Sequence, residues 1–334
     1  MKRARFVLTS ITRIGTGAVR RARRMIPHRP RPAILMYHRV AVDSFDPWGL
    51  AVDPIYFEDQ LRWLSENRTI LSLDELASRH RSGTVPADAI ALTFDDGYAC
   101  VAEVAAPLLR SADAPATVFI APSTIQEIPL FWWDELRSIV LCTGQDSLVL
   151  DGSRVSLGKK SPSDERWKPG DRPRTERQIA FRKIWAALRE KAPAALERAT
   201  SDLRMQSSTP IQAGHARPMG AEQVREAAGE KIRFGSHTLT HSLLTSLDPG
   251  EKVREITESA EACAKLSGQY PTEFAYPFGV LDSESKRLVR EAGFACACTT
   301  AGTSVSPKSD VFALPRIHVR NWNGPRLGYE LARR

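Results

Sequence analysis

Residues 89–98 read AIALTFDDGY, a mostly apolar run that ends in two adjacent aspartates and a glycine. An apolar run of this length before a turn signal predicts a strand buried on both faces of a sheet. The strand delivers Asp95 and Asp96 to one edge of that sheet, and Gly97 lets the backbone turn sharply beside them. Because neighbouring strand residues point to opposite faces, we expect the two carboxylates to have different roles. Two acids in this position predict metal binding or general base catalysis.

A second polar cluster lies at residues 234–241, FGSHTLTH, where His237 and His241 are four residues apart. Residues four apart share one face of a helix, so we expect a helical turn to present both imidazoles to one ion. A single histidine is more often an ordinary core or surface residue. The pair, taken with the two aspartates, favours a divalent-metal site of one carboxylate and two imidazoles, with positions left open for water.

Strand and helix patterns alternate along most of the chain. This alternation predicts an α/β fold with a mostly parallel sheet and with functional residues at the carboxyl ends of its strands. Between about residues 124 and 218 the pattern changes, which predicts a mainly helical insertion with Trp185 among its buried positions. The pair Trp132-Trp133 in this insertion suits either packing onto the body or stacking on a sugar ring. Residues 321–334 are predicted to form a C-terminal tail.

Three short motifs resemble the signature motifs of one family. TFDDG (93–97) and HTLTH (237–241) resemble the first two motifs of the polysaccharide deacetylase (NodB-homology) family of carbohydrate esterases, and FAYPFG (274–279) resembles the third. The resemblance covers about residues 33–320. It implies a distorted, incomplete (β/α) barrel of about seven strand–helix units, interrupted by the insertion.

The same resemblance implies a role for each motif residue. Asp95 corresponds to the catalytic base, and Asp96, His237 and His241 correspond to the metal ligands. From the residues alone, the roles of the two aspartates stay interchangeable. The implied reaction removes acetyl groups from N-acetylated amino sugars of a poly- or oligosaccharide, of the chitooligosaccharide or exopolysaccharide type. The ligand set suits Zn²⁺ first, and Co²⁺, Ni²⁺ or Mn²⁺ are also compatible with it.

The third motif departs from the family pattern at its first position. The family carries an arginine there that orients the catalytic aspartate, whereas this chain has Ala275. Arg316, near the end of a late strand, is the candidate to reach the same carboxylate from another direction. Tyr276, Pro277 and Phe278 are expected to line the substrate groove, and the resemblance implies that the backbone N–H of Phe278 helps to hold the oxyanion.

Two further histidines are candidates for substrate-side roles. The last motif of the family supplies a histidine that protonates the leaving amine, and His318 is the best candidate by location. Strand alternation places it on the same face as Arg316. His38, at the polar end of the first predicted strand, is the reserve candidate for general acid and a predicted substrate-binding residue.

The positive charge of the chain is concentrated at its N-terminus. The formal net charge is +8, yet residues 1–32 hold ten Lys or Arg and no acid, so the remainder carries −2. Apolar residues at helical spacing within this basic arm predict either an amphipathic helix on an anionic membrane surface or a disordered tail. The near-neutral body argues against a nucleic-acid partner.

The N-terminal arm and the cysteines allow predictions of the cellular compartment of the protein and of its redox conditions. The arm lacks the continuous apolar core and the cleavage site of a secretory signal, so we expect no export. No apolar run is long enough for a membrane span. The five cysteines are odd in number and form neither a zinc motif nor a disulfide framework, which favours a reducing compartment. A cytoplasmic protein, with peripheral contact at the inner membrane face, is therefore expected.

Two alternatives to a glycan deacetylase stay open. The first is a metal-dependent amidase that uses the same site on a small molecule, which a narrow closed pocket would favour. The second is a non-catalytic carbohydrate-binding protein at a membrane surface, which rests on the absent arginine of the third motif and on the basic arm. The retained metal ligands argue against the second, because a binding module does not need them.

Overall fold

The computed structural model describes residues 30–43, 46–125, 128, 130–207, 209 and 215–334. The two interpretations of the basic arm therefore concern residues that lie almost entirely outside the described ones. Among the described residues, no helix combines the length and the apolarity that crossing a bilayer requires.

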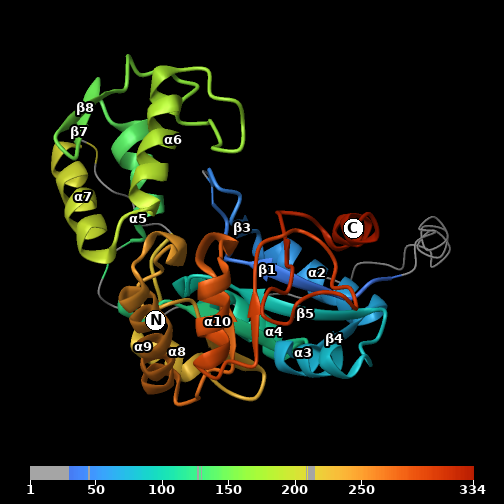
Figure 1. Ribbon diagram of the computed structural model, residues 1–334. Coiled ribbons are helices and arrows are strands. Elements are labelled where there is room, and N and C mark those ends of the chain that lie inside the picture. Colours follow the sequence, from blue (N-terminus) through green and yellow to red (C-terminus); the bar gives the residue numbers. More distant parts are fainter. Residues whose placement is uncertain (1–29, 44–45, 126–127, 129, 208, 210–214) are drawn as a thin grey trace, which may run out of the picture.

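A parallel sheet forms the centre of the molecule, as the alternating pattern predicted (Figure 1). Every strand pair within it is parallel, and the described residues give the sheet eight strands. Seven of them follow one path, which confirms the predicted incomplete (β/α) barrel. In spatial order these are β11 (Cys296–Cys298), β10 (Glu273–Ala275), β9 (Ile232–Ser236), β6 (Ala116–Ile120), β5 (Ala89–Phe94), β1 (Ala33–Tyr37) and β12 (Ile317–His318), and β4 (Thr69–Leu71) pairs with β5 beside them.

Both faces of this sheet are buried, because alternate residues of the central strands pack into different hydrophobic cores. Leu35 of β1 and Ile90 of β5 belong to the larger core, whereas Ile34 and Ala91 belong to a second one. A strand covered on both faces needs a nearly continuous apolar sequence, which explains the composition of residues 89–94.

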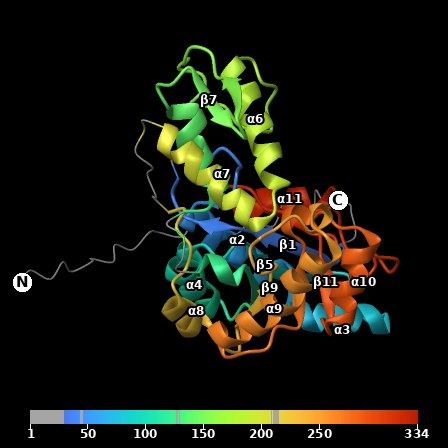
Figure 2. The same ribbon diagram turned by 60° about the vertical axis from the view of Figure 1, so that its left-hand side comes forward.

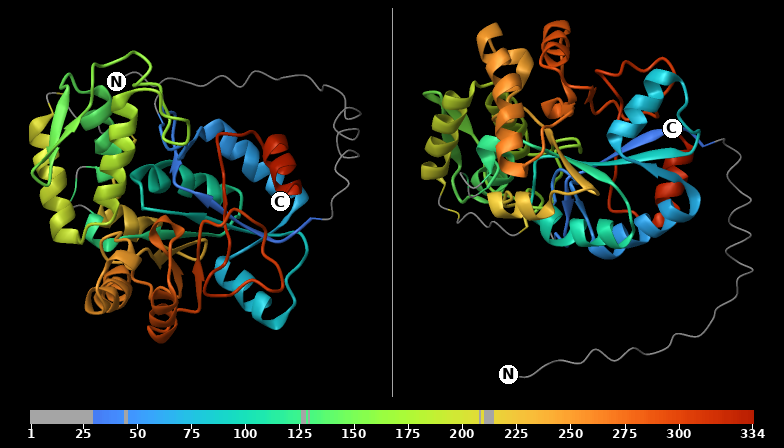
Figure 3. Two further views of the ribbon diagram at one scale, coloured as in Figure 1. Left: turned by 45° about the horizontal axis from the view of Figure 1, so that its top comes forward. Right: turned by 90° about the horizontal axis from the view of Figure 1, so that it is seen from below.

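Helices cover the sheet on its two sides (Figure 3). Side chains of α2 and α4 pack in the larger core, and those of α3 pack in the second. The helices of the body are α2 (Pro54–Asn67), α3 (Leu73–Ser82), α4 (Ala106–Ser111, which continues a π-helical turn, Val101–Ala105), α8 (Ala221–Ala227), α9 (Pro249–Ser267), α10 (Ser283–Glu291) and α11 (Gly324–Ala332), with single 3₁₀ turns at Pro122–Thr124, Leu244–Ser246 and Pro277–Gly279.

One late segment bridges the two edges of the sheet. Leu314 pairs with Cys298 of β11, and Ile317, three residues later, pairs with Leu35 of β1. The late strand that was predicted to hold Arg316 and His318 is therefore divided between two partners. Arg316 lies between the two pairing positions and is fully buried.

The insertion forms a second unit that stands above one end of the sheet (Figure 2). It contains α5 (Trp132–Leu136), a π-helical turn (Arg137–Cys142), α6 (Glu176–Arg189) and α7 (Pro193–Gln206), together with an antiparallel hairpin of β7 (Ser147–Leu150) and β8 (Ser153–Ser156). Its own apolar core includes Phe181, Ile184 and Leu203. Buried Arg177 ties the unit together by donating hydrogen bonds to the carbonyls of Val140, Thr143, Gln145 and Gly158.

The segment predicted as a C-terminal tail contains α11, which packs along α2. Leu327 and Leu331, four residues apart, lie on one face of α11 and are buried there. Gly324 and Gly328 allow the close approach, because a Cβ at Gly328 would lie 2.3 Å from the Trp63 ring. These glycines thus bring α11 and α2 together, and the segment forms a packed helix instead of the predicted tail.

The short strands β2 (Arg39–Val40) and β3 (Ala51–Val52) form a separate pair beyond the end of β1. The loop between them carries Trp48 to the carboxyl edge of the main sheet, where the predicted site lies. The chain thus leaves β1 at His38 and returns over the site before α2 begins.

Candidate active site

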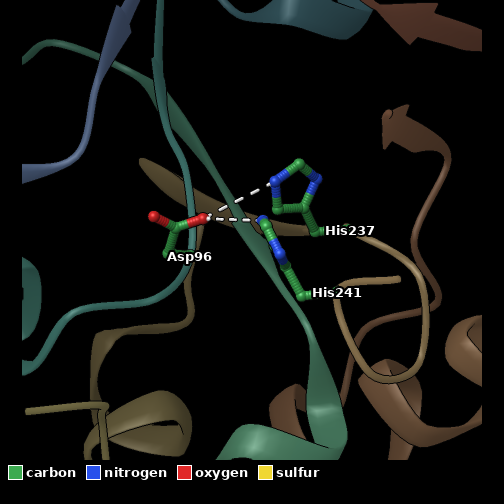
Figure 4. Close-up of side chains that lie close together, drawn as sticks. All are labelled: Asp96, His237 and His241. Atoms are coloured by element: carbon green, nitrogen blue, oxygen red, sulfur yellow. Dashed lines mark ion pairs between the residues drawn. The ribbon is translucent and has the colours of Figure 1, made fainter. Parts of the chain in front are cut away.

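Asp96, His237 and His241 come together at the carboxyl ends of β5 and β9. The Nε2 atoms of His237 and His241 lie 3.6 and 3.3 Å from Oδ1 of Asp96 (Figure 4). All three side chains are buried, and one ligand atom from each lies within 4.8 Å of the others. Within the part of the chain that the structure describes, no other group of three His, Cys, Asp or Glu side chains brings its possible ligand atoms this close together.

The backbone that presents these ligands is left-handed at several positions. Thr238 and His241 have φ values of 63° and 62°, and residues 237–243 form a loop. The helical turn that was expected to carry the two histidines is therefore wrong, although the two imidazoles do converge. Asp96 and Gly97 are also left-handed, and a Cβ at Gly97 would lie 2.8 Å from Cγ2 of Ile120. Gly97 is therefore required for its left-handed backbone conformation and because a side chain there would collide with Ile120.

Each histidine presents Nε2 to the same point. Nδ1 of His237 donates a hydrogen bond of 2.7 Å to the carbonyl of Ala275, which orients the ring. Burial lowers the pKa of His237 to about 4, so the imidazole is neutral and its Nε2 lone pair is free to bind a metal. The ring of His241 is instead held by packing, with its centroid 4.5 Å from that of the Trp133 indole.

This donor set fits a divalent cation. It offers one carboxylate oxygen and two imidazole nitrogens, the mixture that borderline metals such as zinc bind. Three protein ligands also leave coordination positions for water and substrate. The chemistry of the side chains present thus agrees with the metal that the family resemblance implies.

Asp95 forms a bidentate ion pair with Arg316 inside the barrel. The Nη1–Oδ1 and Nη2–Oδ2 distances are 2.5 and 2.7 Å, and both side chains are buried. Burial alone would raise the pKa of Asp95, but the charges of Arg316 and His237 outweigh it and hold this pKa well below its usual value. Asp95 is therefore ionised and fixed in orientation.

Arg316 makes the contact that the sequence suggested in place of the absent motif arginine. Its Nε donates to the carbonyl of Thr299 at 3.0 Å, and its guanidinium lies 5.3 Å from the centre of the Phe119 ring. These contacts fix the planar group from a strand other than the one that holds Ala275. The chain lacks the motif arginine at Ala275, and Arg316 contacts the Asp95 carboxylate from a different part of the sequence.

His38 and His318 face each other across the same cavity. Their ring centroids are 5.2 Å apart, and Nδ1 of His38 and Nε2 of His318 have no hydrogen-bond partner among the described residues. Burial lowers the pKa of both, that of His318 to about 2, with the neighbouring His38 contributing to the effect on His318. Both are neutral imidazoles beside Asp95 and Asp96.

A cavity of about 270 Å³ joins the two aspartates and the four histidines of the site. Phe278, in the left-handed region at φ 59°, lines it as expected. Tyr276 and Pro277 do not line it, so their assignment as groove residues is wrong for their side chains. The Tyr276 ring packs against Phe274 in another core, and its hydroxyl donates to the carbonyl of Phe312. The cavity is lined by Met36, His38, Trp48, Leu50, Asp95, Asp96, Trp133, Trp185, His237, His241, Phe278, Thr300 and His318.

Several of its wall residues were not predicted as site residues, among them Trp48, Trp185 and Thr300. Trp48 lies in an irregular loop without any periodic signal, and Thr300 follows the short strand β11. Trp185 was predicted as a buried residue of the insertion, and it is half-buried because one side of it faces this cavity. Its aromatic type and its place on an apolar helix face gave no indication of which surface it would cover.

Comparisons with known proteins agree with this site. The sequence profile of the family described as Polysaccharide deacetylase matches residues 82–141 and 199–297, and the unmatched residues between them lie within the insertion. YxkH of Bacillus subtilis (strain 168), whose name assigns it to the polysaccharide deacetylases, is 28% identical over 106 residues, which are 32% of this chain. The match spans 38% of the length of that relative.

Solved structures show the same fold at low sequence identity. The Streptococcus pyogenes deacetylase PplD, determined in complex with acetate, superposes with a TM-score of 0.57 at 19% identity, covering 90% of this chain and 98% of its own. BC0361, a polysaccharide deacetylase from Bacillus cereus, gives 0.57 at 15% identity and covers 90% and 69%. IcaB from Ammonifex degensii gives 0.52 at 17% identity and covers 91% and 97%.

The profile match includes the Asp95-Asp96 pair and both histidines of the candidate metal site, and these side chains meet at one edge of the barrel. The chain belongs to the polysaccharide deacetylase family.

Proposed function

We propose that the protein is a metal-dependent hydrolase that removes N-acetyl groups from amino-sugar residues of a poly- or oligosaccharide. One observation carries this proposal. A carboxylate that is held ionised by Arg316 and a three-residue metal-ligand set lie in the wall of a single cavity. Amide hydrolysis requires this combination of a fixed base and a divalent-metal site.

Different residues of the chain have different roles in this proposed reaction. Asp96, His237 and His241 would hold a divalent cation, which when bound would lower the pKa of a water molecule and polarise the amide carbonyl. Asp95 accepts the proton from that water. Arg316 keeps the carboxylate ionised and correctly oriented during this step.

The leaving amine must receive a proton. The proton that Asp95 accepts from water is the source that balances the reaction. Because burial keeps the imidazoles of His318 and His38 neutral at rest, His318 is proposed to take up this proton at its unpartnered Nε2 and to pass it to the amine, and His38 is the alternative. A donor role for His318 predicts that His318→Ala lowers kcat by about 10²-fold while KM changes little. If His38→Ala shows this effect and His318→Ala does not, the assignment passes to His38.

The substrate and the metal are also proposals. The acetate bound to PplD is the product that deacetylation releases, which supports an acetylated substrate here. Exopolysaccharide and chitooligosaccharide are both compatible with the family. Zn²⁺ is the proposed metal, since it accepts two imidazoles and one carboxylate, and Co²⁺, Ni²⁺ and Mn²⁺ are the alternatives to compare.

The decisive experiment measures acetate release from N-acetylglucosamine oligomers by zinc-loaded protein, together with metal content. The parent should release acetate. Asp95→Asn should lose activity but keep stoichiometric metal, whereas His237→Ala should lose both. Exposed His215→Ala is the matched control and should behave like the parent.

Two other outcomes would redirect the proposal. Stoichiometric metal without acetate release would favour an amidase for a different amide, an alternative that the small volume of the catalytic cavity supports. Absence of both metal and acetate release would favour a non-catalytic carbohydrate-binding protein.

A further inference from the structure

One side of α11 carries exposed cationic and aromatic side chains, and this set is called the α11 face below. It consists of Arg326, Tyr329 and Arg333, which are three and four residues apart and therefore lie on the same side of the helix. Tyr329 is 46% exposed, and the guanidinium groups of Arg326 and Arg333 lie 5.1 and 5.5 Å from the centre of its ring. The α11 face is thus an aromatic ring between two cations, all of them open to solvent.

The basic N-terminal arm joins the body beside the end of α11 (Figure 1). Nη1 of Arg31 donates a hydrogen bond of 3.4 Å to the main-chain oxygen of Arg334. One residue after Arg31, the carbonyl of Pro32 accepts a 2.8 Å hydrogen bond from the N–H of Val305, which fixes the chain at this point. Residues 1–32, with ten Lys or Arg and no acid, therefore meet the body next to the α11 face.

Cations in this region lack the anionic partners that exposed arginines have on other helices. Arg254 and Arg287 each pair with a glutamate four residues later. Among the described residues, Arg31, Arg333 and Arg334 have no carboxylate side chain as an ion-pair partner. Like charges that gather without counter-charges repel one another, so an anionic surface is attracted to them without first breaking an ion pair.

An anionic lipid bilayer suits this combination of groups. Its phosphates attract Lys and Arg, and tyrosine is favoured at the level of the headgroups because its ring is apolar and its hydroxyl is polar. The sequence of the arm also places apolar residues among its cations, a composition that suits a membrane surface. We propose that the α11 face and the basic arm together bind the surface of an anionic lipid bilayer. The arm supplies most of the charge, and the α11 face determines which side of the body meets the membrane.

A solvated helix face is the ordinary explanation for exposed arginines. Arg326 fits that explanation, because it forms a 2.5 Å ion pair with Glu330 of the same helix. Arg333 has only the exposed Tyr329 ring beside it, so its charge can be changed without removing an ion pair between described side chains. Arg333 is accordingly the residue that separates bilayer binding from ordinary solvation.

The test measures co-sedimentation of the full-length protein with vesicles of phosphatidylcholine alone, or of equal parts of phosphatidylcholine and phosphatidylserine. The parent should bind the mixed vesicles at least about tenfold more tightly, because each cation near an anionic surface contributes about fivefold to the affinity. Arg333→Glu changes the charge at this position by two units and should weaken that binding by about 25-fold. Tyr329→Ala leaves the charge unchanged and should weaken it by a few-fold.

Two further variants control the experiment. Arg198→Glu makes the same exchange at an exposed position of α7 in the insertion and gives the protein the same net charge. It should bind like the parent, since salt screens charges that are distant from the membrane. Arg333→Gln removes the cation without adding a carboxylate at the end of a helix, and it should weaken binding by about fivefold. Thermal unfolding of each variant shows that it is folded.

The outcomes separate the α11 face from a general effect of charge. Weakening by the Arg333 and Tyr329 variants, but not by Arg198→Glu, would uphold the inference. Equal weakening by Arg333→Glu and Arg198→Glu would show that net charge alone governs binding and would overturn it. Equal affinity for the two kinds of vesicle, or no binding to either, would also overturn it. Tighter binding to a DNA duplex than to the mixed vesicles, with the same loss in Arg333→Glu, would assign the face to nucleic acid instead.

Discussion

At the scale of single residues, the site depends on a charge pair assembled from strands that are distant in sequence. Asp95 follows β5, and Arg316 precedes β12. A buried carboxylate without its partner carries an uncompensated charge, which costs on the order of 3–5 kcal/mol. The Asp95–Arg316 pair thus stabilises the fold and also orients the carboxylate of Asp95. A conservative substitution can separate these two effects.

Arg316→Lys should keep the charge but lose the two-point contact. A lysine ammonium offers a point charge instead of a planar fork, so Asp95 would no longer be fixed by two parallel hydrogen bonds. We expect kcat to fall by about 10²-fold, with metal content retained. Steady-state kinetics and metal analysis check this, with Arg287→Lys in an exposed pair as the control. Parent-like kcat in Arg316→Lys would show that orientation of Asp95 does not limit catalysis.

Residue spacing predicted which side chains meet but not how the backbone brings them together. The four-residue separation of His237 and His241 suggested a helical turn, whereas left-handed φ values at Thr238 and His241 produce the same convergence in a loop. Several backbone paths satisfy one spacing, and non-glycine residues adopt this conformation too seldom for sequence patterns to reveal it.

At the scale of elements, α5 holds the site from one side. Asp134 of α5 accepts a 2.7 Å hydrogen bond from the Tyr98 hydroxyl, which in turn accepts one from Trp133. Arg39, which follows His38, lies 3.8 Å from the same carboxylate. Burial raises the pKa of Asp134 to about 7 although Arg39 and the Tyr98 hydrogen bond oppose this.

This raised pKa predicts a pH-dependent stability. Between about pH 4 and pH 7 the folded protein keeps a proton on Asp134 that the unfolded chain releases, so this group lowers stability as the pH rises. Asp134→Asn removes that contribution. Its free energy of unfolding relative to the parent should therefore increase as the pH rises through this window, by on the order of 4 kcal/mol at the upper end, since each pKa unit corresponds to about 1.4 kcal/mol.

Urea unfolding at several pH values measures this difference. Exposed Asp202→Asn on α7 shows the effect of the same exchange at the surface. A difference between Asp134→Asn and the parent that is constant from pH 4 to pH 8 would contradict the prediction.

Periodicity identified most elements but not the surfaces against which they pack. The boundaries of β6 and α9 agree with an apolar run and with the Asp248-Pro249 start of the helix. For α6 the apolar face was evident, yet Trp185 on it covers the catalytic cavity of the barrel as well as the insertion. Tertiary partners of this kind depend on loop paths, such as that of Trp48, which carry no periodic signal.

At the scale of the whole molecule, the ligand set connects two parts of the chain that the insertion separates. Asp96 precedes the insertion, and His237 and His241 follow it. A cation bound to all three would favour the folded protein over the unfolded one in proportion to its affinity. Zinc at about 100 times its dissociation constant should add about 2.7 kcal/mol.

Zinc should accordingly raise the midpoint of thermal unfolding by a few degrees. His237→Ala should lose this shift because only two ligands remain, whereas His215→Ala should keep it. Differential scanning calorimetry with and without a chelator tests the prediction. An equal shift in His237→Ala and the parent would place the stabilising zinc elsewhere.

Residues 314–317, which pair with both edges of the sheet, also make the alignment of Asp95 a late event while the chain is being synthesised. A ribosome makes Arg316 after residues 95–241, so a growing chain already holds Asp95 and the three candidate metal ligands before Arg316 exists. Until then Asp95 has no Arg316 guanidinium to orient it. A chain cut short before residue 316 would therefore hold the candidate ligand set without the ion pair that fixes Asp95.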